Sequence, residues 1–576
     1  MNVFGFTELA RRSLPSYWDA AAFVLVLAVL VAIVSGSHGV AVPLPPPDVA
    51  PVDLDYWNLP YYALRTTLRM FAALIASLVF TFTYATLCAK SRRAEMVLIP
   101  VLDVLQSVPI LGFLSFTVTF FLNLFPGQVL GAECAAVFAI FTSQAWNMAF
   151  SLYQSLRTVP KDFDEVARGF QLTGWQKFWT LEAPFAVPGL VWNTMMSMSG
   201  GWFFVVAAEA ITVGDTTIKL PGIGSYLAVA IDGKRSDAVF AAVVAMFFVI
   251  LAYDQILFRP IVTWSSKFRV ELSAGEIETR SWVLTIFTRS RWLQSLLSPL
   301  NWVLRRLAYL PLRLPSLPVM NARPSPVLAR TLDWFWYVLI AVVVVWAGWS
   351  TVDYVSTTLG WSDALQSLEL TLITLVRVLV LIFLASIVWV PIGVWIGLRP
   401  GVAEFAQPIA QFLAAFPVNV VFPFAVVNII YFNLNPDIWL SVLIVFGTQW
   451  YILFNVIAGA SAFPHDLREA AANFHVKGWL WWKNVMLPGI FPYYFTGALT
   501  ASGGSWNASI VAEYVKWGED KVSAHGIGNY IAVATENGDF PRIVLGVAMM
   551  SIIVTLLNRF VWRRLFRMAE RRLRLD

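Results

Sequence analysis

Long apolar runs recur along this chain, and short polar or basic segments separate them. An α-helix needs about 20 apolar residues to cross roughly 30 Å of hydrocarbon, and each run is of about that length. The pattern therefore predicts an all-α, polytopic membrane protein with about twelve transmembrane helices. The expected spans lie near 19–36, 63–88, 97–123, 128–150, 184–208, 237–258, 334–352, 366–397, 404–431, 437–460, 487–512 and 541–562.

The composition favours the same class. Of 576 residues, 58% are hydrophobic and 13% are charged, whereas roughly 25% are charged in a soluble domain. The net charge of +5 does not indicate a nucleic-acid partner, because the basic residues gather beside the expected spans, and the expected surroundings are a lipid bilayer. Cys88 and Cys134 have no CxxC partner, which excludes a disulfide scaffold or a cysteine-rich metal site.

Lys and Arg in the short loops predict the orientation. Arg11 and Arg12 precede the first apolar run, and no A-x-A-like cleavage site follows it, so we expect this run to be a span. If spans alternate, the basic loops after the second and fourth spans and the arginine-rich C-terminal tail fall on the inside. Lys219, Lys234 and Arg235 are exceptions in an outer loop. Both termini are therefore expected in the cytoplasm.

Residues 259–333 form the one long stretch without an expected span. Arginines such as Arg305 and Arg306 alternate there with apolar residues such as Trp302, which predicts an amphipathic helix in the inner membrane interface. The segment PLRLPSLP then breaks any helix. We expect a covalent bridge, and a regulatory site is the alternative. The predicted division is 1–258 as a first half (core 63–258), 259–333 as a cytoplasmic linker and 334–576 as a second half (core 366–562).

The second half of the chain repeats the first. GIGSYLAVA returns as GIGNYIAVA 304 residues later, and the same offset maps Glu209 onto Glu513. Earlier in each half the offset is 308, and it pairs Arg69 with Arg377. Because six spans are an even number, both copies face the same way and form parallel repeats about an axis along the membrane normal. A translocation path on that axis is the natural hypothesis.

A short polar segment, EVARGFQLTGW, returns as EAAANFHVKGW between the fourth and fifth spans of each half. Pro160 and Pro464 can open a helix, and Gly174 and Gly478 are expected to end it, because glycine tolerates the left-handed conformation. A second short helix then leads into the fifth span. Each copy is thus predicted to form a helix-turn-helix, named here the first elbow (160–184) and the second elbow (464–488). One copy alone could merely cap two spans, but two copies favour a docking surface.

Both elbows resemble the cytoplasmic EAA loop of binding-protein-dependent, type I ABC importer permeases. GWFFVVAAE, SWNASIVAE, GIGSYL and GIGNYI are similar to the nitrate, sulfonate, taurine and bicarbonate branch of that family. The resemblance covers about five spans per half, so the chain resembles two permease subunits fused into one. Val166 and the pair Arg168–Gly169 depart from the EAA pattern in the first copy.

The resemblance implies a mechanism and a set of partners. Each elbow would be a coupling helix seated in a groove of a cytosolic ABC ATPase subunit, one subunit per half, and ATP and Mg²⁺ would be bound by that partner. It also implies a periplasmic or lipid-anchored solute-binding protein and a place in the bacterial inner (plasma) membrane. The expected coupling residues are Glu165, Ala167, Gly174, Trp175, Glu469, Ala470, Ala471, Gly478 and Trp479.

The chain itself carries no recognisable catalytic motif. It has no G-x-x-x-x-G-K-[ST] loop, and DGKRS lacks the upstream glycine and has Arg235 where Ser or Thr should hold magnesium. The four histidines form no metal-ligand cluster. We therefore expect a transport subunit with no catalytic residue, no metal and no cofactor of its own.

Ionisable residues inside spans are costly, which makes them candidates for the translocation path. Arg69 and Arg377 could line it, or they could tie spans together or snorkel, and Glu209 and Glu513 could gate its outer end. Residues of the fifth span of each half could line the path or pack between helices. A small anion is expected as the substrate by analogy only. The fifth-span candidates are Asn193, Ser197, Trp202, Trp506 and Asn507.

A secondary transporter of the major facilitator type is the rival hypothesis, because it also has two parallel six-span halves. Such a transporter needs no ATPase and has no repeated inner elbow between spans four and five. A purely structural membrane protein is disfavoured because it would have no need for a duplicated elbow.

Overall fold

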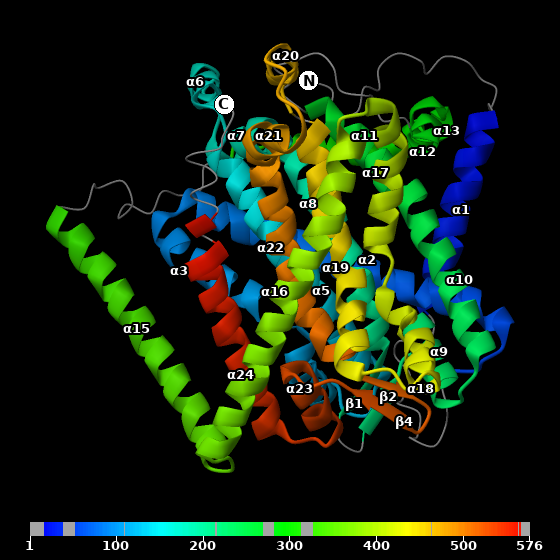
Figure 1. Cartoon of the computed structure of the whole chain (residues 1–576). Helices are drawn as coiled ribbons and strands as arrows, with labels where there is room; N and C mark the ends of the chain where they lie inside the picture. Colours follow the sequence, from blue (N-terminus) through cyan, green and yellow to red (C-terminus); the bar gives the residue numbers. More distant parts are fainter. Residues whose placement is uncertain are drawn as a thin grey trace.

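The computed structural model (Figure 1) describes residues 17–37, 52–108, 110–213, 216–268, 281–312, 326–461, 463–562 and 564–565. Arg11, Arg12, most of PLRLPSLP and most of the arginine-rich C-terminal tail lie outside the described residues. Long helices that run side by side make up most of the described chain, as expected for an all-α membrane protein.

The first half contains the helices of the early spans, the first elbow and a pair of short strands. The helices of the expected spans are α1 (Tyr17–Ser37), α2 (Leu59–Lys90), α3 (Arg92–Ser107), α4 (Leu114–Leu124), α5 (Val129–Arg157), α8 (Ala183–Glu209) and α10 (Ser236–Tyr253). The shorter elements are η1 (Tyr56–Asn58), η2 (Ile110–Phe113), α6 (Lys161–Gly169), α7 (Gly174–Lys177), η3 (Phe178–Glu182), β1 (Ala210–Val213), β2 (Thr216–Lys219), α9 (Ile223–Asp232), η4 (Asp254–Phe258), α11 (Arg259–Ser265) and η5 (Ser266–Phe268).

The linker contributes α12 (Trp282–Arg289) and α13 (Arg291–Ala308), and the second half then repeats the order of the first. The helices of its expected spans are α15 (Pro326–Ser356), α16 (Trp361–Gly397), α17 (Pro400–Ala415), α18 (Phe422–Tyr431), α19 (Pro436–Ser461), α22 (Leu487–Ala512) and α24 (Phe540–Leu557). The shorter elements are η6 (Val418–Val420), α20 (His465–Asn473), α21 (Gly478–Trp481), η7 (Trp482–Met486), β3 (Tyr514–Trp517), β4 (Asp520–Ser523), α23 (Ile527–Glu536) and η8 (Asn558–Trp562).

Eight helical segments of the described chain are long and apolar enough to cross a membrane. They coincide with eight of the expected spans, and the longest, α16, has 37 residues. α8 and α22 fill two further expected spans with 27 and 26 residues, and their sequences are richer in serine and glycine. The described architecture is therefore that of a polytopic membrane protein.

The spans expected near 97–123 and 404–431 are not continuous helices. Each is broken into two shorter helices by a 3-10 turn, η2 in the first half and η6 in the second. Phe416 leaves the helical region with φ −71° and ψ 123°, because the ring of Pro417 restricts the residue before it. The two predictions are corrected to helix pairs that break at matching places.

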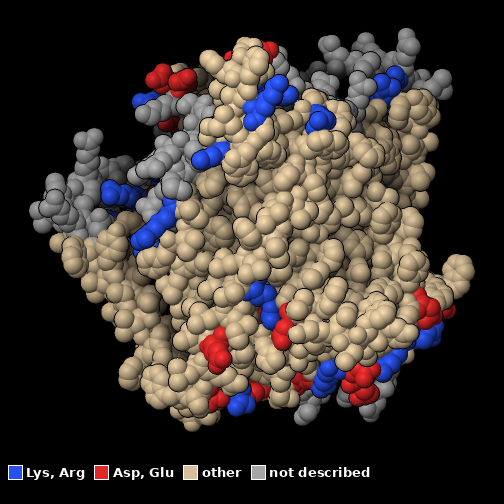
Figure 2. Space-filling view, viewed as in Figure 1, with Lys and Arg blue, Asp and Glu red and all other residues tan. Residues whose placement is uncertain are grey.

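The two ends of the bundle differ. The elbow helices α6, α7, α20 and α21 lie at one end, and the strand pairs and α23 lie at the opposite end (Figure 1). Charged residues gather at the two ends on the face shown in Figure 2, and an almost uncharged band separates them. Each strand pair is an antiparallel hairpin, with Ala210 opposite Lys219 in the first and Tyr514 opposite Ser523 in the second. These hairpins were not part of the all-helical prediction.

The halves share one interior, because each of the two large hydrophobic clusters contains buried side chains of both halves. Two of the hydrogen bonds between the halves are equivalent, because each joins the broken third span of one half to the fifth span of the other. The Ile110 N–H at the first break donates to Asn507 Oδ1 of α22 at 2.8 Å. The Asn419 side-chain amide at the second break donates to the Phe203 carbonyl of α8 at 3.2 Å. Each broken helix therefore docks on the fifth span of the other half.

Candidate functional site

In the first elbow, the left-handed residue after the helix is not the glycine that was expected. α6 follows Pro160, and Gln171 then takes the left-handed conformation with φ 50°. Gly174 begins α7, and the prediction that it ends a helix is wrong. Thr173 caps α7, because its hydroxyl accepts the Gln176 N–H while the Gln176 side chain accepts the Thr173 N–H.

The second elbow has the same shape with one change. His475 takes φ 54° just after α20, at the position that corresponds to Gln171. Gly478 does adopt a left-handed conformation, with φ 60°, but it begins α21 and does not end α20. Only this glycine of the expected pair needs the conformational freedom that glycine provides.

The expected coupling residues divide by exposure. Ala167 and Ala471 correspond to each other and are buried, with 5% and 7% of their surface exposed. The two glutamates that precede these alanines face solvent, and so do the two glycines that begin α7 and α21. The indoles differ, because Trp175 is half-buried and Trp479 is 75% exposed. The exposed members are Glu165, Gly174, Glu469, Gly478 and Trp479, and Ala470 is half-buried.

A chain of ion pairs fastens the first elbow to the bundle. Lys177 of α7 pairs with Asp164 of α6 and, at 3.0 Å, with Glu182, which also pairs with Lys90 at the end of α2 at 2.6 Å. The hydrogen bond from Lys177 lowers the pKa of Asp164. Burial alone would lower the pKa of Lys177, but its bonds to Asp164 and Glu182 outweigh burial and raise it.

The second elbow does not repeat this chain. The corresponding positions hold Arg468, Trp481 and Met486, and Leu398 takes the place of Lys90. The two elbows therefore share a shape but differ in how they are attached to the bundle.

One pair of elbow residues was missed by the sequence reasoning. Phe170 and Phe474 follow the elbow helices, lie 304 positions apart, and are 76% and 82% exposed. A single exposed phenyl ring needs no special explanation, but a ring at the same position of both elbows favours a contact surface. The signal was present, because the phenylalanine recurs at the same interval in EVARGF and EAAANF.

At the opposite end, Glu209 is fully buried and closes what we name the first clasp. Its carboxylate accepts hydrogen bonds from Thr66 Oγ1 at 2.7 Å, Arg69 Nη1 at 2.6 Å and the Gly224 N–H at 2.7 Å. Arg69 also donates to Glu133 at 2.5 Å. The first clasp thus joins α2, α5, α8 and the start of α9.

The glycines of GIGSYL leave room for this carboxylate. A Cβ added at Gly222 would lie 2.3 Å from the Glu209 carboxyl carbon, and one at Gly224 would lie 2.3 Å from the Val206 carbonyl oxygen. Gly222 has φ 178°, so space and not backbone conformation requires glycine there.

The second clasp repeats this arrangement around Glu513, which is 1% exposed. Its carboxylate accepts from Thr374 Oγ1 at 2.9 Å, from Arg377 and from the Gly528 N–H at 2.8 Å. Asp437 replaces Glu133 and lies 3.5 Å from Arg377. The four charged residues expected near the path therefore form one arginine–glutamate pair in each half, and these pairs tie spans together.

The expected fifth-span residues are placed inside the bundle. Trp202 and Trp506, which correspond by sequence, are 0% and 1% exposed, and Ser197 is 3% exposed. Asn193 donates to Ser151 of α5 at 2.8 Å, within its own half. Asn507 bonds to the other half, because its side-chain oxygen accepts the Ile110 N–H.

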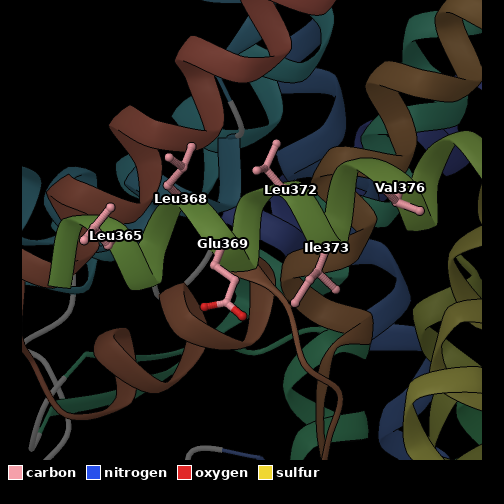
Figure 3. A pocket seen from close by; sticks show the side chains of 6 residues that line it. All are labelled: Leu365, Leu368, Glu369, Leu372, Ile373 and Val376. Atoms are coloured by element: carbon pink, nitrogen blue, oxygen red, sulfur yellow. The ribbon is translucent and has the colours of Figure 1, made fainter. Parts of the chain in front are cut away.

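A shallow, apolar pocket lies along the exposed side of helix α16 (Figure 3). Glu369 is the one charged side chain among its lining residues, and in the close-up it points to the same side of the helix as Ile373. None of the expected path or coupling residues lines this pocket. The lining residues are Leu365, Leu368, Glu369, Leu372, Ile373 and Val376.

Comparison with known proteins identifies the repeated unit. Residues 81–258 and 389–575 each match the family described as "Binding-protein-dependent transport system inner membrane component". The chain belongs to this family. The permease carries two copies of the family domain, one in each half, and such domains belong to transport subunits and not to catalytic ones.

Curated relatives place the permease beside the nitrate and bicarbonate branch. It is 30% identical over 192 residues to the bicarbonate transport system permease protein CmpB of Synechococcus elongatus, covering 33% of this chain and 66% of that relative. It is 28% identical over 189 residues to the nitrate import permease protein NrtB of Synechocystis, covering 33% and 65%. The glycine betaine/carnitine transport permease protein GbuB of Listeria monocytogenes is 29% identical over 204 residues, covering 35% and 66%. The aligned part thus spans just under two thirds of each relative's length.

Proposed function

We propose that this permease forms the membrane path of an ATP-driven importer for a small anion. Each elbow docks on a separate cytosolic ABC ATPase subunit, which binds ATP and Mg²⁺, and a solute-binding protein delivers the substrate. The proposal rests chiefly on two matching elbows, each with an exposed phenylalanine, at the same end of one membrane bundle. Both termini lie on the side of the elbows in this proposal, which is the cytoplasmic side of a bacterial inner membrane.

Each elbow has one buried alanine and one exposed phenylalanine, and this arrangement supports docking. Ala167 and Ala471 face inward, while Phe170 and Phe474 project from the turn that follows each helix. Burying an exposed phenyl ring in a partner's groove stabilises the complex by about 1.5–3 kcal/mol. Two rings on two sides of the pseudo-symmetry axis can transmit the closing of an ATPase pair to the two halves.

The substrate class follows from the relatives. Bicarbonate and nitrate, named for the permeases CmpB and NrtB, are both small and carry one negative charge. The fifth spans α8 and α22 meet the broken helices of the opposite half, and the proposed path runs between them. The clasps keep their charged residues in pairs, so the path need not hold a free carboxylate that would repel an anion.

The Phe474→Ala substitution tests docking at the second elbow. We expect it to weaken retention of the ATPase subunit by about tenfold to a hundredfold, because the lost burial is about 1.5–3 kcal/mol. Co-purification and ATP-driven anion uptake in proteoliposomes are the measurements, and Phe170→Ala should act in the same way at the first elbow.

The matched control is Phe432→Ala, which removes another largely exposed phenyl ring (61%) next to the C-terminus of α18. It should leave ATPase retention and uptake unchanged. If both elbow variants retain the ATPase fully, the docking assignment is wrong. Uptake that proceeds without any ATPase would instead favour the secondary transporter.

A further inference from the structure

The linker helix α13 is held at its N-terminus by the first span. Asp19, buried in the first turn of α1, accepts hydrogen bonds from Ser290 Oγ and from the Trp292 N–H, both at 2.8 Å. The Arg289 guanidinium lies 5.4 Å from the centre of the Trp18 ring. This end of the helix is therefore fixed at the level where α1 enters the bilayer.

The other end of α13 is held by the first elbow. Trp175 Nε1 donates to the Leu307 carbonyl at 2.7 Å, and Gln176 Nε2 donates to the Tyr309 carbonyl at 2.9 Å. The helix has 18 residues, which corresponds to a length of about 27 Å. It therefore crosses the elbow end of the bundle as a strut from α1 to the first elbow, where α12 and α13 are seen in Figure 1.

The uncovered surface of this strut is apolar and positively charged. Only Leu293 of α13 is buried, and an exposed stripe runs along the helix at intervals of three and four residues. Residues 281–312 contain four arginines and no Asp or Glu. An apolar stripe beside arginines is typical of a helix that lies in the headgroup layer of a bilayer. The stripe consists of Trp292, Leu296, Leu300, Val303 and Leu307.

We propose that α13 binds anionic phospholipid of the inner leaflet and thereby holds the first elbow, and only that elbow, in position. Both ends of the strut are bonded at the depth where spans leave the hydrocarbon, so its stripe meets acyl chains and its arginines meet phosphates. This inference depends on the membrane position of the chain and not on ATPase docking. It gives the linker a lipid-binding role in addition to joining the halves.

The second elbow does not have the pair of side chains that bonds the first elbow to the end of α13. Leu480 stands in place of Gln176, and Trp479, in place of Trp175, is 75% exposed. A change in lipid charge should therefore affect the two elbows unequally.

Hydrogen exchange of the full chain in nanodiscs tests the proposal without any partner protein. One set of discs contains phosphatidylcholine alone, and the other contains a mixture with phosphatidylglycerol. We expect α13 and α7 to exchange more slowly in the mixed discs and α21 to exchange equally in both. The difference should shrink at high salt, because salt screens exposed charges.

Two variants separate lipid binding from its transmission to the elbow. Arg306→Gln should reduce the lipid-dependent protection of α13 by a factor of about five, the contribution expected of one cation near an anionic surface. Arg399→Gln, at an exposed arginine between α16 and α17, is the control and should change nothing. Trp175→Phe should leave the response of α13 intact and weaken that of α7, which keeps only the bond from Gln176 to the Tyr309 carbonyl.

The outcomes are distinct. Equal exchange of α13 in both kinds of disc overturns lipid binding, and an equal response of α7 and α21 overturns the selective hold on one elbow. Protection of α13 that appears only after an ATPase subunit is added assigns the stripe to a protein partner and overturns the proposal. Loss of ATPase docking in the phenylalanine variants would leave this result untouched.

Discussion

At the scale of single residues, the two buried glutamates explain the most strongly repeated sequence in the chain. Glu209 and Glu513 each accept a backbone N–H from the second glycine of a GIG motif. A buried carboxylate is stable only when paired and hydrogen-bonded, and each clasp supplies an arginine and a threonine for that purpose. A side chain at the first glycine of each motif would occupy the space of the carboxylate, and one at the second would clash with a backbone carbonyl of the fifth span.

The Gly224→Ala substitution tests this explanation. Its Cβ would lie 2.3 Å from the Val206 carbonyl oxygen, so we expect the free energy of unfolding to fall by about 1–3 kcal/mol, as for other overpacked sites. Thermal unfolding of the purified chain in detergent is the measurement.

Gly503→Ala provides the control, because nothing lies within 4 Å of a Cβ built there in helix α22. It should be neutral or stabilise the chain by up to about 1 kcal/mol, since alanine favours a helix over glycine. Equal melting of both variants would contradict the steric role of the GIG glycines.

At the scale of elements, each hairpin is attached to the short helix that follows it. In the second hairpin, Glu536 of α23 pairs with Lys516 at 2.8 Å and Lys521 at 3.0 Å and accepts the Tyr514 hydroxyl at 2.5 Å. In the first hairpin, Asp232 of α9 pairs with Lys219 at 2.8 Å. The acidic residue at the end of the short helix therefore holds the strands in both halves.

This attachment predicts a pH dependence of the second hairpin. Burial alone would raise the pKa of Glu536, but the bonds from Lys516, Tyr514 and Lys521 outweigh it and lower the pKa to about 2. A carboxyl with a lowered pKa stabilises the folded state above its ordinary pKa. We therefore expect protection of β3–β4 to be full at neutral pH and to fall as the pH drops from the ordinary value of 4.5 towards about 2.

Hydrogen exchange of residues 514–523, corrected for the intrinsic effect of pH, measures this protection. Glu536→Gln should remove the dependence and lower protection severalfold at neutral pH, because a neutral amide pairs more weakly with two lysines. Glu519→Gln in the hairpin turn removes the same charge and should keep the dependence. An unchanged profile in Glu536→Gln would mean that another group titrates.

At the scale of the whole molecule, the two halves are interlocked and not merely side by side. The break in each third span docks on the fifth span of the other half, at Asn507 in one case and Phe203 in the other. A rocking motion of the halves would have to change or carry along these two contacts, which lie beside the proposed path.

Asn507→Ala should loosen one of these contacts. The Ile110 N–H would lose its acceptor, and an unsatisfied polar group in the bundle costs about 1–3 kcal/mol. We expect a lower melting temperature and a higher passive leak of anions through proteoliposomes. Asn428→Ala, which removes only a bond inside α18, is the control and should change neither. A wild-type leak and melting temperature in Asn507→Ala would show that this contact does not limit the motion.

Much of the fold could be predicted because membrane spans are encoded locally. A run such as 366–397 must be helical in lipid, where every backbone group needs a partner within the segment. Part of the candidate site could also be predicted, because repetition marked Glu165, Glu469 and the tryptophans after them. The turn at Gln171 was missed because its left-handed conformation has no glycine signal. Phe170 was missed because exposure depends on the neighbouring helices.

The sequence by itself determined the membrane class, the duplication and the repeated elbows, since hydrophobic length and internal repeats are properties of the chain order alone. The tertiary structure decided that Arg69 and Glu209 share one clasp, that Asn507 reaches the opposite half, and that α13 ends on the first elbow. Those contacts join residues more than 100 positions apart. Which of them form depends on how the helices pack, and no local pattern of apolar and polar residues carries that information.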